Sequence, residues 1–313
     1  MSIKFEHVSV LLDESVKLLE VKPDGTYADG TLGGGGHSEL ICSKLGDGGR
    51  LVGIDRDRTA IEAASERLKK YGNTVSIVHD NFANIKKILE RLEISGLDGA
   101  ILDLGVSSPQ LDDAERGFSY NAEARLDMRM NRDDSLSAYE VVNSYEESEL
   151  SRIIFTYGEE RFARQIARGI VSAREQSPIE TTTQLSEIIR HSMPAKARFS
   201  DKHPAKRTFQ AIRIEVNNEL GILEGALRDF ADVLLPGGVL SVITFHSLED
   251  RIVKRVFSSL AAGCTCPKEF PVCVCGRKPL VVPVNRKPIV SGASELAANN
   301  RAHSAKLRAV RKL

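Results

Sequence analysis

A run of glycines near the start of the chain is the first feature whose residue types and spacing could do chemistry. The segment Asp29-Gly30-Thr31-Leu32-Gly33-Gly34-Gly35-Gly36-His37 lies between a short apolar stretch and a stretch of helical character. Glycines let the backbone approach a ligand closely, and free N–H groups at the start of the following helix can donate to an anion. A glycine run by itself can also be a plain turn, so it needs support from a second feature.

A carboxylate further along the chain gives that support. Asp55 ends the apolar run Arg50–Asp55, and an acidic residue about twenty residues after such a loop accepts hydrogen bonds from the ribose hydroxyls of a nucleotide cofactor. Asp55 alone could instead cap a helix in the sequence Asp55-Arg56-Asp57. The loop and the carboxylate at this spacing together favour a nucleotide-like cofactor.

The form of the loop narrows the cofactor class. It lacks the Gly-Lys-Ser/Thr ending of a phosphate-binding P-loop, which argues against ATP or GTP, and its four consecutive glycines differ from the dinucleotide pattern Gly-x-Gly-x-x-Gly. Asp29, directly before the loop, suits a ligand with a cationic ammonium group, such as the amino group of methionine. We therefore expect S-adenosylmethionine as the cofactor.

Two aromatic residues beside this site have two interpretations each. Phe82 follows the third apolar run, where it either stacks on an adenine or packs in the core, and Asp80 can bond the adenine amino group. His37 either contacts the ligand or caps the helix after the glycines.

The elements that must position these residues alternate along the chain. Short apolar runs predict buried strands over 26–29, 50–55, 74–78 and 99–104, with helical segments between them and a last strand over 239–245. Strands that alternate with helices imply a doubly wound, mostly parallel sheet with both faces covered, which is an α/β fold of Rossmann type. Asp57 is expected to cap the helix after the second strand.

The alternation stops between Pro109 and about Met193, where the pattern is helical and charged. Thr181-Thr182-Thr183-Gln184 is a capping-box signature within this part. A helix over Val216–Leu235 then returns to the α/β pattern. The sequence predicts a core formed by residues 1–108 and 213–313, with an inserted all-helical, substrate-recognising domain over 109–212.

Bulk composition limits the class of protein. The chain has 313 residues, and its 43 Lys and Arg are balanced by 43 Asp and Glu. A polyanionic partner such as a nucleic acid would therefore have to bind to a local basic patch. No stretch is long and apolar enough to span a membrane, and the N-terminus has no signal-peptide core, so a cytoplasmic protein is expected.

Such a basic patch occurs between Arg190 and Arg213. Its basic residues alternate with Phe199, His203 and Phe209, a pattern suited to phosphate contacts and base stacking. A solvated helix face is the alternative. The expected RNA contacts are Lys202, His203, Lys206, Arg207 and Arg213, and a basic C-terminal tail adds Arg301, Lys306, Arg308, Arg311 and Lys312.

Four of the five cysteines lie within residues 264–275, as Cys264-x-Cys266 and Cys273-x-Cys275. Four thiolates so close together can hold one zinc ion. However, zinc sites more often use Cys-x-x-Cys pairs, and this segment contains Pro267 and Pro271. We therefore expect no metal and leave a structural zinc open.

Several longer motifs resemble the RsmH (MraW) family of 16S rRNA methyltransferases, and the resemblance extends from about His7 to Arg308. The motifs are residues 103–112, 115–119, 126–130, 157–162, 203–213 and 245–251. The resemblance implies methyl transfer from S-adenosylmethionine to N4 of a cytosine in the decoding centre of the small ribosomal subunit, with 16S rRNA rather than DNA as partner and no metal. It also implies cofactor contacts at Gly35, Gly36, His37, Asp55, Phe82, Asp103 and Gln110.

The chemistry of this reaction singles out a few further residues. Cytosine N4 is a poor nucleophile because its lone pair is delocalised, so catalysis depends on positioning and electrostatics. Many amino-methyltransferases place Asp/Asn-Pro-Pro-aromatic after the fourth strand, but this chain has Asp103-Leu104-Gly105-Val106-Ser107-Ser108-Pro109. We expect Asp103 on the cofactor side and Ser107 or Ser108 as an acceptor from the amine.

After the fifth strand, His246 and Asp250 are candidate proton or hydrogen-bond partners. The alternative is structural, because Ser247-Leu248-Glu249-Asp250 has the form of a capping box. Two other functions stay open: a methyltransferase of the same fold that acts on DNA, protein or a small molecule, and a non-catalytic RNA-binding or ribosome-assembly factor.

Overall fold

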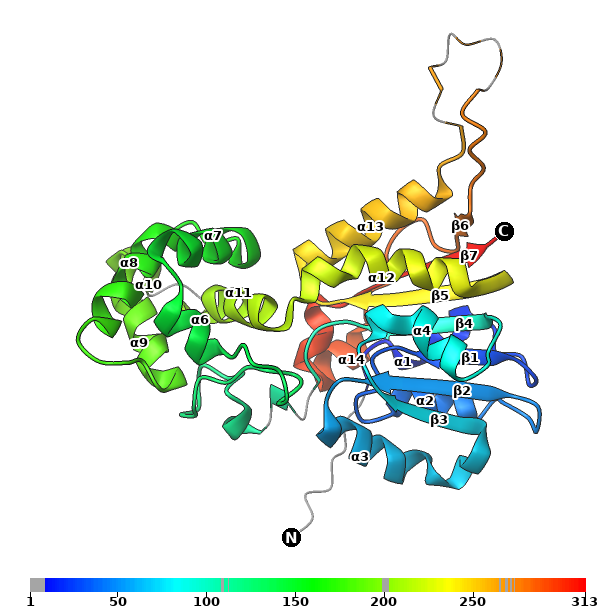
Figure 1. Ribbon diagram of the computed structural model, residues 1–313, viewed down its shortest axis with the longest axis horizontal. Helices are drawn as coiled ribbons and strands as arrows, with labels where there is room; N and C mark the ends of the chain where they lie inside the picture. Colours follow the sequence, from blue (N-terminus) through cyan, green and yellow to red (C-terminus); the bar gives the residue numbers. More distant parts are fainter. Residues whose placement is uncertain are drawn as a thin grey trace. The chain divides into compact units, whose positions relative to one another are not determined.

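The computed structural model describes residues 9–107, 110–111, 113–198, 203–264, 266–267, 270, 272 and 274–313. The chain forms two compact units (Figure 1). The core unit comprises Met1–Gly105 and Leu220–Leu313, and the helical unit comprises Val106–Glu219.

The core unit is built on a sheet of seven described strands in the order β3-β2-β1-β4-β5-β7-β6. The first five are parallel: β1 Thr26–Asp29, β2 Arg50–Asp55, β3 Val75–His79, β4 Leu97–Asp103 and β5 Leu234–Thr244. The last two, β7 Lys306–Lys312 and β6 Val281–Pro283, run antiparallel to their neighbours. The strand order reverses between β1 and β4, and ligands bind at such a switch point in open α/β sheets.

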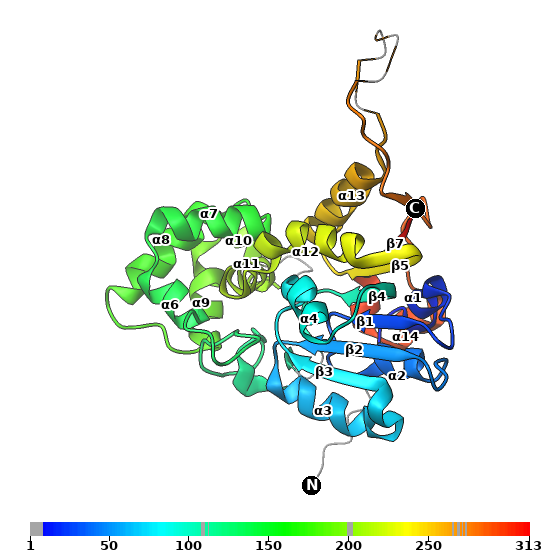
Figure 2. The same ribbon diagram turned by 45° about the vertical axis from the view of Figure 1, so that its right-hand side comes forward.

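Helices cover both faces of this sheet, as Figure 2 shows. Apolar side chains of α4, α12 and α13 pack on one face in a cluster with Val52, Leu102 and Val242. Side chains of α1, α2 and α3 form a second cluster with Tyr27, Leu51 and Ile101. The helices are α1 Leu12–Leu19, α2 Gly36–Cys42, α3 Arg58–Leu68, α4 Ile85–Arg91, α12 Glu219–Val233, α13 Ser247–Ala261 and α14 Ala293–Ala298, with 3₁₀ turns η1 Lys69–Thr74, η2 Phe82–Asn84 and η4 Asn300–Ser304. The predicted doubly wound α/β class is confirmed.

Local sequence signals correctly predicted the N-terminal caps of two helices. Asp57 caps α3 by accepting a hydrogen bond from the backbone N–H of Thr59, as predicted. The capping box at Thr181 is also present, with Gln184 as its second member. The predicted helix over Val216–Leu235 was wrong in extent, because Asn218 adopts a left-handed conformation (φ 48°) and separates α11 from α12.

The C-terminal residues are not a free basic tail, which corrects the prediction. Lys306–Lys312 is β7, paired with β5 from Val239↔Arg311 to Thr244↔Lys306. Leu307 and Val310 are buried, so the apolar residues of this segment face the core. Side chains alternate between the two faces of a strand, so Leu307 and Val310 lie on opposite faces of the sheet, each in a different apolar cluster.

The helical unit has its own apolar core, formed by residues from all but the shortest of its helices. Its helices are α6 Ala138–Ser144, α7 Glu147–Gly158, α8 Ala163–Arg174, α9 Thr182–Ser192, α10 Ala195–Arg198 and α11 Lys206–Asn217, with the 3₁₀ turn η3 Ala114–Arg116. The unit ends at Glu219, whereas the sequence placed its end at Ile212. The later boundary follows from α11, which continues to Asn217 and buries Val216 in this core.

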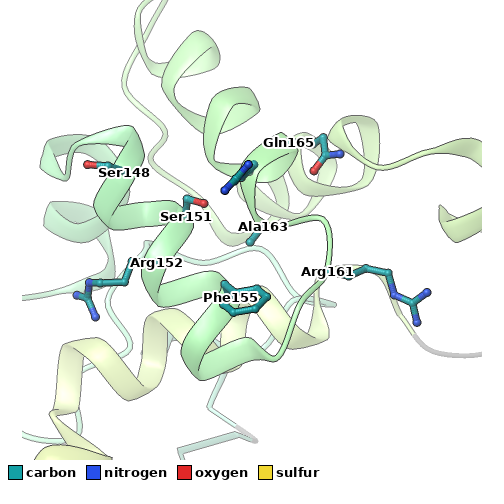
Figure 3. Close-up of a pocket in the computed structure, with 8 residues that line it drawn as sticks. Ser148, Ser151, Arg152, Phe155, Arg161, Ala163 and Gln165 are labelled. Carbon is teal, nitrogen blue, oxygen red and sulfur yellow. The ribbon is translucent and has the colours of Figure 1, made fainter.

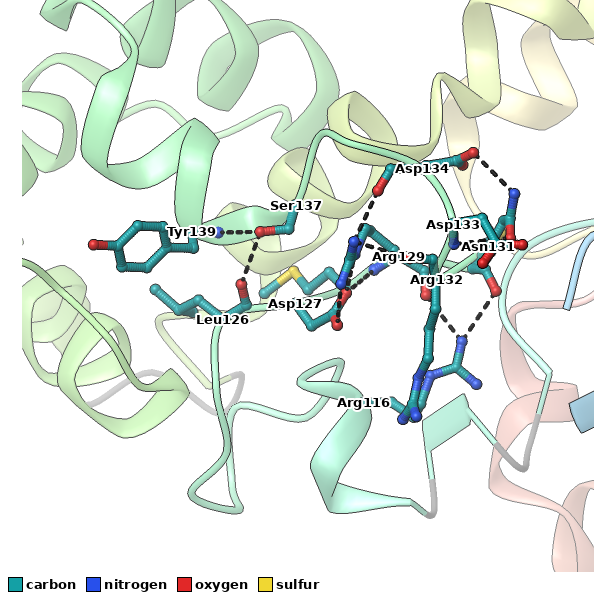
Figure 4. A network of polar contacts seen from close by, with 12 residues as sticks. Arg116, Leu126, Asp127, Arg129, Asn131, Arg132, Asp133, Asp134, Ser137 and Tyr139 are labelled. Carbon is teal, nitrogen blue, oxygen red and sulfur yellow. Dashed lines mark hydrogen bonds and ion pairs between the residues drawn. The ribbon is translucent and has the colours of Figure 1, made fainter. Parts of the chain in front are cut away.

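A polar network orders the long non-helical segment before α6 (Figure 4). The guanidinium of Arg129 donates to both carboxylate oxygens of Asp127 and to the backbone carbonyl oxygens of Arg132 and Asp134. From α11, the Asn217 side chain accepts from the N–H of Met130 and donates to the carbonyl oxygen of Met128. Buried backbone groups outside helices and strands need hydrogen-bond partners, and in this segment the side chains of Arg129 and Asn217 provide them.

Candidate functional site

Three carboxylates end three neighbouring parallel strands of the core unit. Asp29 ends β1, Asp55 ends β2 and Asp103 ends β4. Asp29 pairs in register with Gly53 and Ile101, so Asp55 and Asp103 each extend two residues beyond it on the flanking strands. The sheet therefore brings the three side chains to one edge, beside the turn that follows β1.

The glycine segment is a fixed turn rather than a loose one. The N–H of Gly33 donates to Oδ2 of Asp55 at 2.7 Å, and the N–H of Gly35 donates to the carbonyl oxygen of Leu32 at 2.8 Å. Gly33 (φ 49°) and Gly35 (φ 78°) are both left-handed, a conformation that L-residues disfavour. Gly35 is the N-cap of α2, so the turn delivers the chain directly into a helix N-terminus.

The glycines at this turn have different reasons for lacking a side chain. A Cβ at Gly36 would lie 2.1 Å from the Ser9 hydroxyl, so this glycine is required by packing. A Cβ at Gly34 would have no other described atom within 4 Å. Gly34 is thus the point where the backbone meets open space and where a ligand can approach. The contacts implied by the family resemblance, at Gly35 and Gly36, did not include Gly34.

Asp55 holds the turn with both of its carboxylate oxygens. Oδ1 accepts from the N–H of Asp57 at 2.9 Å, and Oδ2 accepts from Gly33. Burial raises the pKa of Asp55, and the backbone hydrogen bonds oppose that rise. Each carboxylate oxygen has a second lone pair, so this group can still accept from hydroxyls of a ligand.

Asp29 is committed to the protein itself. Its side chain accepts from the N–H of Thr31 at 3.1 Å and from the hydroxyl of Ser38 at 2.7 Å, and the residue is only 1% exposed. Burial raises the pKa of Asp29 to about 6. The expected role beside a ligand ammonium group therefore suits another carboxylate better.

Asp103 has the properties that Asp29 lacks. Its backbone N–H donates to the hydroxyl of Thr31 at 2.6 Å, which ties the end of β4 to the turn after β1. Its Oδ1 is buried and has no hydrogen-bond partner among the described residues. Burial raises the pKa of Asp103 to about 8, with Arg301 opposing and Asp29 and Glu249 adding to the rise. A buried carboxyl oxygen without a partner is costly, so this position calls for a donor or a cation.

The remaining expected cofactor residues lie in varied surroundings. His37 is buried in the first turn of α2, with Nε2 3.3 Å from the carbonyl oxygen of Val10. Phe82 begins η2, half-buried, and packs against the core cluster on the α4 face. Gln110 belongs to the helical unit, is buried, and accepts from the N–H of Ser107 at 3.0 Å.

Besides Asp103, two of the expected catalytic residues, Ser107 and His246, lie within the described part of the chain. The Ser107 hydroxyl, in the helical unit, is buried and has no hydrogen-bond partner among the described residues. His246 is the N-cap of α13, with Nε2 3.1 Å from Oε1 of Glu249. Ser108 lies outside the described residues.

The capping box of α13 differs from the one expected at Ser247. His246 is its N-cap residue and Glu249 its second member, and Oε2 of Glu249 accepts from the backbone N–H groups of Phe245 and His246. Asp250 instead accepts from Arg308 at 2.7 Å and from Lys306 at 3.2 Å, both on β7. These hydrogen bonds hold the pKa of Asp250 below its usual range against the effect of burial. Asp250 therefore joins α13 to β7 and is not a free proton acceptor.

The expected RNA contacts separate into accessible and committed side chains. Lys206 is exposed at the start of α11, whereas Arg207 donates to the carbonyl oxygen of Glu159 at 3.1 Å. His203 stacks on Tyr120, with ring centroids 4.4 Å apart. Lys202 lies outside the described residues.

Two residues of this basic segment are corrected by the structure. Arg213 donates two hydrogen bonds to the Glu219 carboxylate, at 2.8 and 2.9 Å, and both side chains are largely buried. Phe209 is 3% exposed within the core of the helical unit, so it cannot stack on a base. Helical spacing explains both, because α11 turns these side chains toward its own unit.

Sequence reasoning missed a groove on the helical unit between α7 and α8 (Figure 3). It has a volume of about 650 Å³ and includes Phe155, whose side chain is 66% exposed. Its other lining residues are Ser148, Ser151, Arg152, Arg161, Ala163, Arg164 and Gln165. The available signal was the group of arginines near Phe155 in the sequence, at Arg152, Arg161 and Arg164.

Within the described part of the chain, no helix combines the length and apolar character needed to cross a membrane.

Comparisons of the sequence with known proteins show the family of this chain. Residues 4–313 match the sequence model of the MraW methylase family. Ribosomal RNA small subunit methyltransferase H of Clostridium botulinum (strain Kyoto) is 58% identical over 311 residues, which is 99% of this chain and all of that protein. The enzyme of the same name from Brevibacillus brevis is 54% identical over 312 residues, which is 100% of this chain and 99% of that protein.

Among solved structures, an rRNA methylase from Streptococcus thermophilus aligns with 98% of this chain and 99% of its own, at 10% identity and a TM-score of 0.44. The family match over nearly the whole length decides the assignment, and the predicted cofactor is confirmed with it. This chain belongs to the MraW methylase family, which is a family of S-adenosylmethionine-dependent methyltransferases.

Proposed function

We propose that this chain transfers a methyl group from S-adenosylmethionine to the exocyclic N4 of a cytosine in the decoding centre of 16S rRNA, within the small ribosomal subunit. The observation that carries the proposal is Oδ1 of Asp103, which is buried next to the glycine turn and has no hydrogen-bond partner in the described part of the chain. The names of the relatives, which are small-subunit rRNA methyltransferases, support the substrate class. Such a substrate places the work of the protein in the cytoplasm and requires no DNA.

The residues at the sheet edge fit the proposed cofactor. The unpartnered Oδ1 of Asp103 suits the ammonium group of the methionine part, which would also return this carboxyl to its charged form. Asp55 suits the ribose hydroxyls, and the half-buried Phe82 suits the adenine. Gly35, Gly36, His37 and Gln110 complete the proposed contacts, and the open backbone at Gly34 joins them.

When bound, the cofactor supplies an electrophilic methyl group on a sulfonium sulfur. As the new N–CH₃ bond forms and the S–CH₃ bond breaks, the N4 amine must lose one proton. The protein's part is to orient the amine and to accept from its N–H groups, because the nucleophile is weak. We assign this acceptor role to Ser107 or Ser108, with His246 as the candidate that receives the proton.

For RNA recognition, we retain the residues expected from the sequence, with one exception. Lys206, Lys202 and His203 are the proposed contacts. Arg207, whose side chain is partly exposed, is a further proposed contact. Arg213 is left out because its guanidinium is already paired with Glu219. Phosphate contacts of this kind set affinity and position rather than sequence choice.

Mapping the methylated atom tests the proposal. The purified chain is incubated with radiolabelled S-adenosylmethionine and, in parallel, small subunits, protein-free 16S rRNA or duplex DNA. Nuclease digestion and mass spectrometry against N4-methylcytidine and C5-methylcytidine standards then identify the product. We expect N4-methylcytidine at one position of the 16S rRNA in small subunits. Label on C5, on a protein or only on DNA would reject the proposed acceptor.

A further inference from the structure

The segment between α13 and β6 lacks the packing that normally fixes a long loop. Residues 262–280 contain no helix or strand within their described part, and most of their described apolar side chains are exposed. Phe270, Val272 and Val274 are 50%, 70% and 74% exposed. Loops of this length without an apolar core need another source of order, such as a disulfide or a metal ion.

Three cysteine side chains of this segment nevertheless converge. The Sγ atoms of Cys264, Cys266 and Cys275 all lie within 4.8 Å of one another. The Sγ atoms of Cys264 and Cys275 are 3.7 Å apart. A disulfide would require about 2.05 Å between the sulfurs. Two thiolates on one tetrahedral zinc, each with a Zn–S bond of about 2.3 Å, lie about 3.8 Å apart. The observed separation thus corresponds to an edge of a zinc tetrahedron.

The backbone also favours thiolate at this place. The N–H of Cys266 points at Sγ of Cys264, with a distance of 3.4 Å. Such N–H groups stabilise negative charge on a ligating sulfur, as outer-shell partners do in metal sites. The short Cys-x-Cys spacing, which counted against zinc in the sequence, is what lets the N–H of the second cysteine reach the sulfur of the first.

We propose that Cys264, Cys266 and Cys275 bind a structural zinc ion that orders the loop between α13 and β6. Each thiol gives up its proton on binding, so three protons leave as three Zn–S bonds form. Cys273, the other cysteine of the sequence-based set, lies outside the described residues. The site is separate in role from the proposed cofactor pocket, since none of its ligands lies at the strand ends.

Metal content and cobalt spectroscopy test this site. The full chain is prepared without a polyhistidine tag, in zinc-supplemented medium and under reducing conditions, and its metal is measured by mass spectrometry after desalting. We expect about one zinc per chain. After exchange into cobalt(II), we expect thiolate-to-cobalt charge-transfer bands and the visible bands of a tetrahedral ion.

Single substitutions locate the ligands. Cys264→Ser and Cys275→Ser are expected to lose most of the zinc and to increase proteolysis within residues 262–280 several-fold. Cys42→Ala is the matched control, because Cys42 is a buried core cysteine outside the cluster, and it should retain the metal. Binding of S-adenosylmethionine should persist in all three variants. Zinc far below one per chain, a cobalt spectrum without thiolate bands, or full zinc in Cys264→Ser would overturn the proposal.

A second inference concerns the groove of the helical unit and rests on the proposed rRNA substrate. Phe155 is exposed in this groove (Figure 3), and Arg152, Arg161 and Arg164 are among the residues that line it. No ion-pair partner of Arg161 or Arg164 occurs among the described residues, whereas Arg152 lies 3.8 Å from Glu215. An exposed aromatic side chain that shares a groove with two arginines free of ion pairs among the described residues suits a stacked base and its flanking phosphates.

We infer that this groove binds a single-stranded segment of the substrate RNA. The test compares Phe155→Ala and the pair Arg161→Glu with Arg164→Glu in methylation of small subunits. Tyr139→Ala and Lys254→Glu are the controls, because both are exposed and outside the groove. We expect KM for the subunit to rise about tenfold in the groove variants, with kcat and S-adenosylmethionine affinity unchanged.

The outcomes separate this inference from the proposed function. If the unaltered chain does not methylate small subunits, the proposed function fails. If it does, and the groove variants have the KM of the controls, the groove inference alone fails. Loss of binding to subunits together with full binding to protein-free 16S rRNA would show a protein partner instead of RNA and would overturn the inference.

Discussion

The N–H of Gly33 donates a 2.7 Å hydrogen bond to Oδ2 of Asp55, so the end of β2 directly holds the turn that follows β1. Gly33 and Asp55 are separated by 22 positions in the sequence, where the glycine run as a whole and Asp55 were expected to bind a ligand. In the structure they also support each other. The turn is thereby built before any ligand arrives, which reduces the entropy cost of binding.

This bond predicts the effect of Asp55→Asn. The amide keeps one acceptor oxygen but places an NH₂ group opposite a backbone N–H, of Gly33 or of Asp57. We expect a loss of about 1–3 kcal/mol in unfolding free energy and a fall in cofactor affinity. Chemical denaturation and calorimetry measure the two effects. Unchanged stability with lost affinity would mean that Asp55 serves only the ligand.

The raised pKa of Asp103 predicts opposite pH effects on stability and on binding. Between its usual pKa near 4 and the folded value of about 8, the folded protein holds a proton that the unfolded chain has released. Stability of the free protein therefore falls as pH rises through this window. Asp103→Asn should remove that fall, raise Tm at pH 8, and abolish cofactor binding.

Binding of S-adenosylmethionine should release a proton from Asp103 below pH 8, because the ammonium group stabilises the charged carboxylate. Affinity should consequently rise from pH 6 to pH 8. Calorimetry in buffers of different ionisation enthalpy counts the released proton. The Asp103→Asn variant is the control for stability, since it should show a flatter dependence of Tm on pH.

The glycine turn allows a paired substitution. Gly36→Ala would place Cβ 2.1 Å from the Ser9 hydroxyl, so we expect a loss of about 1–3 kcal/mol in stability. Gly34→Ala has open space and should fold normally, but its methyl group should lower cofactor affinity. Thermal unfolding and calorimetry distinguish the two. Ser9→Ala added to Gly36→Ala should restore part of the stability, because the remaining Cβ contact is 3.3 Å.

Two cations of α11 should behave differently. Arg213→Ala leaves the largely buried Glu219 without its partner, so we expect a loss of about 3 kcal/mol in stability. Lys206→Glu changes an exposed side chain and should leave Tm within a degree or two, while it weakens RNA binding. Filter binding at two salt concentrations checks the second effect. RNA affinity lost in a fully stable Arg213→Ala would restore Arg213 as an RNA contact.

The sequence by itself determined the elements whose causes are local. The parallel strands, the turn at Gly33–Gly36, the cap at Asp57 and the capping box at Thr181 follow from apolar periodicity and from side-chain to backbone bonds within a few residues. The ends of parallel strands share one edge of a sheet, so the meeting of Asp55 with the glycine turn was predictable as well.

Only the tertiary structure decided which polar groups are already partnered. Lys306 and Arg308 looked like a solvated tail, but β7 pairs with β5 and brings them to Asp250, more than fifty residues away in sequence. Arg213 and Phe209 looked accessible, but α11 turns them inward. Conversely, the sequence did not reveal that Oδ1 of Asp103 has no partner among the described residues, or that the thiols of Cys264 and Cys275 converge. Burial and pairing depend on contacts between distant segments, and residue type and spacing do not record them.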